Sequence, residues 1–177
     1  MAVIDEERVL AIASHRRSSK EVLEMLDRFR PALVGVDSPC DAAPCGATLR
    51  ECERAVRDAV CGIRWTPDDA TLDAGDPYYG WIRRGLALYR ALDATGWDWI
   101  EVFPTASWTR WAGERRGSRA AWTTSALPRL GLANLPARTS QDVRDAIAAA
   151  VTARQHEHGE TESFGPIVVP SATRARV

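Results

Sequence analysis

The hydrophobic and polar pattern of the first 40 residues predicts two short strands, a helix and a third strand. Residues 2–4 and 8–13 have strand character, and the polar Asp-Glu-Glu between them suits a hairpin turn. Ser18 to Glu21 has the sequence of a helix-starting capping box, and apolar residues then recur at helical spacing until Pro31. The Val-rich run 32–39 is too short for a helix and ends at Ser-Pro, so we expect a buried strand.

The rest of the chain continues this alternation of helices and strands. The pattern predicts helices over 48–60, 80–95 and about 140–155, and an aromatic, β-branched strand over 97–103. Residues 65–79 are rich in Pro, Gly and Asp and suggest an irregular loop. The prolines in 165–170 suit an edge strand or an extended tail. We therefore expect an α/β fold with a mixed sheet, in which the strand after the first helix lies parallel to a neighbour.

Composition narrows the class of protein without indicating an activity. The chain has 177 residues, 45% hydrophobic and 27% charged, so we expect one domain over 1–177 that buries roughly 70% of its unfolded surface. The net charge of −1 gives no overall basic field, so any nucleic-acid contact would need a local basic patch. No apolar run of 18 residues and no signal-peptide pattern is present, which predicts a cytoplasmic protein without a membrane partner.

Four cysteines fall within 22 residues, at Cys40, Cys45, Cys52 and Cys61. Their spacing matches none of the paired zinc-binding patterns, so we expect reduced thiols. Convergence of the four on a structural zinc ion stays open as the alternative.

Acidic residues form the most informative candidate site. Asp37 ends the buried strand, where ligands gather in open α/β sheets. Asp142 and Asp145 lie three residues apart near the start of the last helix and share one face with a stripe of alanines. Three converging carboxylates would repel one another without a cation, and Mg²⁺ or Mn²⁺ suits such oxygen ligands. Glu101 is either a fourth acid of this site or a structural ion-pair residue. The alternative for the two helix acids is a capping box over residues 139–142 with favourable helix-dipole charges.

A second candidate surface lies between residues 107 and 122, where three tryptophans are interleaved with arginines. Arginine can bind phosphate while indole stacks on bases, which makes this stretch a candidate nucleic-acid contact. In the alternative, the tryptophans are core residues beside a solvated basic loop. The arginines concerned are Arg110, Arg115, Arg116 and Arg119.

Several short motifs follow one another in a fixed order along the chain. They are Val-Gly-Val-Asp-Ser-Pro, Arg-Glu-Cys-Glu-Arg at 50–54, Ile-Glu-Val-Phe-Pro at 100–104, Asp-Val-Arg-Asp-Ala at 142–146 and the closing Gly-Pro-Ile-Val-Val-Pro. This ordered set resembles a bacterial and archaeal family, domain of unknown function 429. The resemblance implies an RNase-H-like fold and a predicted metal-dependent nuclease. By analogy with Holliday-junction resolvases, it implies that Asp37, Asp142 and Asp145 bind metal.

One departure from the resembled fold affects the candidate site. RNase-H-like domains begin with a three-strand meander whose first strand carries a metal-binding aspartate, whereas this chain has room for two strands before its first helix. Either the start is assigned too late, or the protein keeps the scaffold and has lost the full metal site. An uncovered sheet edge would favour a homodimer. The sequence thus predicts a Mg²⁺-dependent nuclease, with a non-catalytic scaffold or interaction protein as the alternative.

Overall fold

The computed structural model describes residues 1–13 and 18–172. The strands are β1 (Ala2–Ile4), β2 (Val9–Ile12), β3 (Val34–Val36), β4 (Trp99–Val102), β5 (Thr161–Phe164) and β6 (Ile167–Pro170). The α-helices in the described residues are α1 (Ser19–Phe29), α2 (Glu51–Ala59), α3 (Asp69–Asp73), α4 (Gly80–Thr95), α5 (Pro104–Ala112), α6 (Arg119–Ala126) and α7 (Gln141–Glu157). Two 3₁₀ turns are η1 (Pro77–Tyr79) and η2 (Leu127–Leu130).

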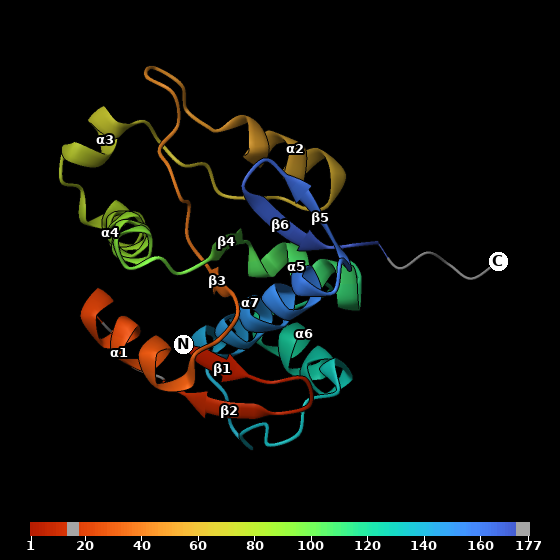
Figure 1. Cartoon of the computed structure of the whole chain (residues 1–177). Helices are drawn as coiled ribbons and strands as arrows, with labels where there is room; N and C mark the ends of the chain where they lie inside the picture. The colour runs from red at the N-terminus through yellow and green to blue at the C-terminus, as the bar shows by residue number, and fades with distance from the viewer. Residues whose placement is uncertain (14–17, 173–177) are drawn as a thin grey trace.

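The strands form two separate sheets, as Figure 1 shows. β1 and β2 make the expected antiparallel hairpin, which is a sheet of its own. The other four strands form a mixed sheet in the order β3-β4-β6-β5, in which β5 is antiparallel to its neighbour and the other pairs are parallel. The mixed α/β class is therefore confirmed. β3 is parallel to β4 and does not pair with the hairpin that precedes it.

Helix α7 packs on both sheets and holds them in one structure (Figure 1). Its larger apolar residues, including Ile147 and Val151, join the core beneath the hairpin. Its alanines, Ala149 and Ala153, pack against β4 and β6. The contact with β3 is close: a Cβ atom added to Gly35 would lie 2.5 Å from the carbonyl oxygen of Ala149. The alanine stripe thus does what its sequence suggests, because small side chains let the helix backbone approach the sheet.

The opposite face of the four-stranded sheet is covered by other helices. α1 and α4 pack on β3 through a cluster that contains Leu26, Tyr89, Leu92 and Val36. α2 and α5 pack on β6 through a cluster of Val56, Ala106, Ile167 and Val169. Residues of β3 and β4 that alternate with those facing α7 therefore point toward this second layer.

The structure corrects the expectation for the end of the chain. Residues 167–170 form β6, which pairs with β4 on one side and β5 on the other, so this segment is neither an edge strand nor a tail. All four of its residues are buried. Pro170 is tolerated because the next residue, Ser171, donates to the Glu160 carbonyl at 2.9 Å, so the nitrogen of Pro170 faces away from β5 and lies beyond the last residue pair between β4 and β6. The edge strand on this side of the sheet is β5, which the pattern did not reveal.

Two further segments contain helices that the pattern did not indicate. Residues 104–126 carry α5 and α6, and the loop over 65–79 contains the short α3 and η1. Asp68 starts α3 and Asp76 starts η1, each accepting a hydrogen bond from a backbone N–H of the first turn. The same aspartates that mark a loop in the sequence therefore cap short helices.

The cysteines are unpaired, in agreement with the expected reduced thiols. All four cysteines are free. Within residues 1–13 and 18–172, we find no helix with both the length and the apolar character needed to cross a lipid bilayer.

Candidate functional site

Three predicted acids lie on one groove of about 940 Å³. Asp37 follows β3 directly, and alternation along the strand places it on the same face as Gly35, which meets α7. Asp142 and Asp145 come from the first two turns of α7. All three residues line the groove, and the charges of Asp142 and Asp145 act on Asp37. The strand-end acid and the two helix acids therefore share one groove.

Asp37 occupies an unfavourable position for a negative charge. Asp37 lines the groove and is exposed to solvent. No described residue forms a hydrogen bond or an ion pair with its carboxyl group. Crowding by surrounding protein raises the pKa of its carboxyl, and the negative charge of Asp145 raises it further. Although Arg119 opposes the shift, the pKa of Asp37 rises to about 7. Perturbed carboxyls of this kind are typical of functional sites.

Asp145 is held firmly by neighbouring side chains. It is 8% exposed. Its Oδ1 accepts hydrogen bonds from the indole Nε1 of Trp108 and from Nε2 of Gln141, both at 3.0 Å. Its Oδ2 accepts from Nη2 of Arg119 at 3.0 Å. Asp145 therefore has a fixed orientation and a partly neutralised charge.

Asp142 is exposed, and the described residues supply it with no hydrogen bond or ion pair. The helix begins at Ser140, whose Oγ accepts from the Val143 N–H at 3.2 Å. This confirms a helix cap but corrects the expected capping box, because the third helical residue is valine and cannot reach back to the cap. Asp142 lies in the first turn, where its negative charge interacts favourably with the helix dipole. Its carboxylate oxygens remain available to bind a cation.

The donor set fits a hydrated cation better than a closed metal cage. The oxygens of Asp37, Asp142 and Asp145 do not all lie within 4.8 Å of one another. Mg²⁺, however, commonly keeps several waters and uses one or two protein carboxylates. Asp37 and Asp142 offer two carboxylates that form no ion pair with any described residue, next to the carboxylate of Asp145. These two residues would hold the ion, with Asp145 contributing charge and its remaining lone pairs.

Glu101 has a different role from these acids. It alternates with Ile100 and Val102, which face α7, so it points to the opposite side of the sheet. Arg50 donates two hydrogen bonds, of 2.9 and 2.5 Å, to the carboxylate of Glu101, and the Cys40 N–H donates a third at 2.9 Å. Of the two roles open to Glu101, the geometry favours the structural ion pair.

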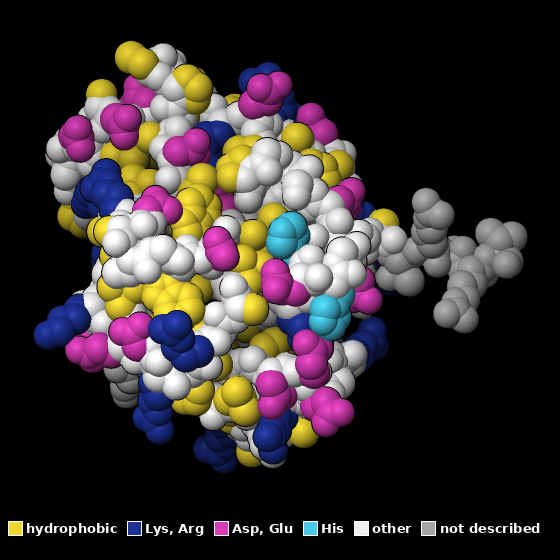
Figure 2. Space-filling model, in the orientation of Figure 1, with side chains coloured by type: hydrophobic (Ala, Val, Ile, Leu, Met, Phe, Trp, Pro, Cys, Tyr) yellow, Lys and Arg dark blue, Asp and Glu magenta, His cyan; other side chains and the backbone are white. Residues whose placement is uncertain are grey.

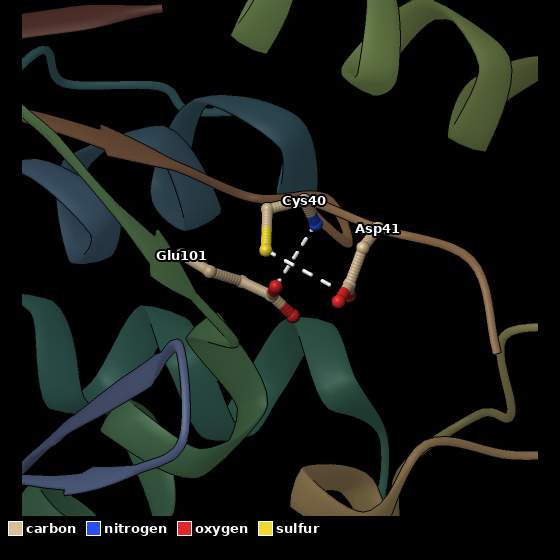
Figure 3. Close-up of side chains that lie close together, drawn as sticks. All are labelled: Cys40, Asp41 and Glu101. Carbon is tan, nitrogen blue, oxygen red and sulfur yellow. Dashed lines mark hydrogen bonds between the residues drawn. The ribbon is translucent and has the colours of Figure 1, made fainter. Parts of the chain in front are cut away.

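The group around Glu101 is a buried charge network centred on Arg50. Arg50 also donates to Asp41 at 2.6 Å and to Glu53 at 3.1 Å. Figure 3 shows Cys40 and Asp41 beside Glu101. Each of the three offers one atom that could bind a metal ion, and these atoms lie within 4.8 Å of one another. Burial opposes the charge on Arg50, but Glu101 and Asp41 raise the pKa of its guanidinium. Because the guanidinium of Arg50 already binds these carboxylates through hydrogen bonds, we assign this cluster a structural role.

The predicted nucleic-acid stretch is divided between internal and exposed residues. Trp108 and Trp122 are core residues, 0% and 7% exposed, so they offer no free face to a base. Arg110 pairs with Glu162, and Arg119 pairs with Asp145 and also donates to Thr105 at 2.5 Å. For these residues, the structure follows the alternative of core tryptophans. The exposed arginines of this segment that have no ion pair in the described residues are Arg115 and Arg116.

The structure adds residues that sequence reasoning did not assign. Arg50 is the centre of the buried network, and its spacing of three from Glu53 is the only local signal that links them. Trp108 and Arg119 orient Asp145 across 37 and 26 residues of chain. No local pattern could reveal those two contacts, because they depend on how α5 and α6 pack against α7.

Comparison with known proteins identifies a family and no closer relative. The profile of a family described as "Protein of unknown function (DUF429)" matches residues 1–168. No curated protein and no solved structure matches the chain. Since the match spans nearly the whole sequence, the chain belongs to the DUF429 family of proteins of unknown function.

Proposed function

We propose that this protein is a metal-dependent nuclease that hydrolyses phosphodiester bonds of nucleic acid, with Asp37 and Asp142 as ligands of Mg²⁺ or Mn²⁺. The observation that carries the proposal is the raised pKa of Asp37 beside two further acids on one groove. Such an arrangement is electrostatically unfavourable by itself and becomes favourable when a divalent cation is bound.

Each acid has a distinct part in this proposal. When bound, the cation would activate a water molecule for attack on phosphorus and stabilise charge on the phosphate oxygens. Asp37 and Asp142 would bind the cation through carboxylates that have no ion pair in the described chain. Asp145 would present its carboxylate in a fixed orientation, because Trp108, Gln141 and Arg119 donate hydrogen bonds to it. Arg115 and Arg116 are two of the exposed cations that would be available for phosphate.

A non-catalytic scaffold or interaction protein is the second candidate, and two observations favour it. Glu101 and Asp145 are both engaged in internal ion pairs. Figure 2 also shows basic side chains scattered among acidic ones on the visible face, with no continuous basic surface. The two candidates differ in whether the groove binds a divalent cation.

Metal binding and cleavage test the proposal together. Purified protein is incubated with single-stranded DNA, duplex DNA, a four-way junction and RNA, in Mg²⁺, in Mn²⁺ and in EDTA. Calorimetry without nucleic acid measures cation binding separately. We expect cleavage that requires the cation, and loss of both cation binding and cleavage in Asp37→Asn and Asp142→Asn. Asp73→Asn, an exposed aspartate on α3, is the matched control and should change neither.

Two results would contradict the nuclease. Cleavage that persists in EDTA and in both variants would show that another protein or another site is responsible. Absence of cation binding by the folded protein at millimolar concentration would favour the scaffold.

A further inference from the structure

A second cleft lies beside α3, outside the groove that holds the acids. It has a volume of about 700 Å³, and its lining comes from three segments, residues 46–48, 63–71 and 78–79. Among the described residues, none from β1, β3 or α7 lines it. Figure 1 shows the loop before α2 beside α3, an arrangement that brings these segments together. The cleft is therefore a surface separate from the acidic groove.

Three aromatic rings line this cleft, those of Trp65, Tyr78 and Tyr79. Trp65 is 41% exposed and Tyr78 is 59% exposed. Elsewhere in the part of the chain that the structure describes, the exposed large apolar side chains are Leu10 and Trp81. Single exposed apolar residues are ordinary, but a cluster of exposed rings is typical of a binding surface.

The rings are held by their neighbours. The guanidinium of Arg57 lies over the Trp65 ring, 5.3 Å from its centre. Because Arg57 does not line the cleft, the ring meets the cleft on a part that Arg57 does not cover. Tyr78 and Tyr79 pack edge to face, with ring centres 5.0 Å apart.

The backbone segments around the cleft are also tied together. Oδ2 of Asp68 accepts a hydrogen bond from the Gly46 N–H, and Oδ1 accepts one from the Thr71 N–H, both at 3.0 Å. Arg83 of α4 donates to the carbonyl oxygen of Asp76 at 2.9 Å, just before the two tyrosines. A preformed cleft of this kind lowers the entropy that is lost when a ligand binds.

One cation of the cleft is free to meet a negatively charged ligand. Arg64 lines the cleft, is exposed and forms no hydrogen bond or ion pair with any described residue. Both carboxylate oxygens of Asp68, the acid of the lining, accept backbone hydrogen bonds. Asp69 and Asp73 of α3 are exposed nearby but do not line the cleft. Their charges weaken the attraction for a polyanion, so the rings should supply most of the affinity for such a ligand.

The cleft lies next to the acidic groove along the chain. Tyr79 lines the cleft, and Trp81 lines the groove together with Arg84. Two residues of chain span at most about 7 Å. A strand of nucleic acid in the groove would therefore pass close to the cleft.

We propose that this cleft binds unpaired bases of a single-stranded nucleic acid. Bases stack on Trp65 and Tyr78, and Arg64 contacts a phosphate. The choice of nucleic acid among ligands with flat rings rests on the proposed function, since cleavage in the adjacent groove requires a strand beside Tyr79. Because every base has a π face, this contact is tolerant of sequence.

Binding is measured in EDTA, where a metal-dependent nuclease is inactive. The probe is a fluorescent ten-nucleotide oligothymidylate, followed by anisotropy. We expect saturable binding that weakens about fivefold or more when the bases are replaced by abasic sites, because the stacking contacts are lost. A duplex of the same length should also bind more weakly, since its bases already stack on one another.

Salt dependence separates stacking from binding to a broad basic surface. The slope of the logarithm of the association constant against the logarithm of salt concentration should be about −0.7 to −1.4, which corresponds to one or two phosphate contacts. A slope of about −4 or steeper would overturn the proposal, because several cations would then be needed.

Protein variants show whether the oligonucleotide occupies this cleft. Trp65→Ala and Tyr78→Ala should each weaken binding about fivefold or more, whereas Tyr78→Phe keeps the ring and should stay within about twofold. Leu10→Ala, at an exposed apolar residue outside the cleft, should leave binding unchanged. Arg64→Gln should weaken binding about two- to fivefold. Arg90→Gln, at an exposed arginine of α4 that does not line the cleft, is its control.

Four results would overturn the proposal besides a steep salt slope. They are no detectable binding of oligothymidylate up to about 1 mM, equal affinity for the abasic oligomer, and unchanged binding in both alanine variants. The fourth is a proline-rich peptide that binds the natural protein, fails to bind Tyr78→Ala and is not displaced by oligothymidylate, since the partner would then be a protein.

The measurements also separate this proposal from the nuclease. Oligothymidylate that binds in EDTA but is not cleaved in Mg²⁺ or Mn²⁺ would contradict the nuclease and support the base-binding cleft. Cleavage with a KM that Tyr78→Ala leaves unchanged would overturn the cleft as a substrate contact and support the nuclease.

Discussion

The guanidinium of Arg119 donates a hydrogen bond to Oδ2 of Asp145 at 3.0 Å. The sequence suggests a nucleic-acid contact for the first residue and a metal ligand for the second. Their pairing means that substitution of Asp145 affects both folding and any chemistry in the groove. Variants at Asp37 and Asp142 are therefore the cleaner tests of function.

Asp145→Asn should lower the free energy of unfolding by about 1 to 3 kcal/mol, because Arg119 and Trp108 lose a charged acceptor in a buried position. Asp142→Asn should change it by less than about 1 kcal/mol, since that residue contributes mainly a helix-dipole charge. Urea denaturation of both variants measures the difference. Equal effects would contradict the distinct environments of the two acids.

Asp37 should make the metal-free protein less stable as the pH rises. Its carboxyl has a pKa of about 7 in the folded chain and an ordinary value of 3.8, so between these values the folded chain keeps a proton that the unfolded chain releases. The free energy of unfolding therefore falls with increasing pH through this window. Asp37→Asn should remove that dependence. The free energy of unfolding of the variant, relative to that of the natural protein, should therefore increase as the pH rises to about 7 and stay constant above it.

Denaturation at pH 5, 6, 7 and 8 in EDTA measures this effect. Asp73→Asn is the control. This substitution of an exposed aspartate outside the groove should leave the pH profile of stability unchanged. Parallel profiles for the natural protein and Asp37→Asn would show that Asp37 titrates as an ordinary surface carboxyl. Addition of Mg²⁺ at pH 8 should stabilise the natural protein and have little effect on Asp37→Asn.

Arg50→Met should destabilise the fold by about 3 to 5 kcal/mol, because it leaves the carboxylates of Glu53 and Glu101 buried without a cation. Arg54 lies on the exposed face of α2, the helix that Arg50 precedes. The free energy of unfolding of Arg54→Met should stay within about 0.5 kcal/mol of that of the natural protein. Chemical denaturation compares the two. Similar stabilities would show that the network around Glu101 is not a structural requirement.

Gly85→Ala should be destabilising although alanine is the better helix former. An added Cβ would lie 1.8 Å from Oγ and 2.4 Å from Cβ of Ser38, so α4 would have to move away from β3. We expect a loss of about 1 to 3 kcal/mol. Ser38→Gly should restore stability in the double variant, since the remaining contact, to the Cα atom, is 3.8 Å. A double variant as unstable as Gly85→Ala would contradict this contact.

The sequence by itself determined much of the local structure and the position of the candidate acids. A short apolar run identified β3, and helical patterns identified α1, α4 and α7, because such patterns reflect which residues of each element are buried. The end of a Val-rich strand marked Asp37, and spacing on one helix marked Asp142 and Asp145. Each of these signals is contained in a single helix or strand and its immediate flanks.

Only the tertiary structure decided which charges are paired and which strands are neighbours. Arg50 meets Glu101 and Arg119 meets Asp145 because helices distant in sequence pack on the sheet and on α7. The separation of the hairpin from β3, which opens the acidic groove, likewise depends on strand pairing between remote segments. Local patterns report burial, whereas electrostatic partners and strand edges depend on contacts across the whole fold.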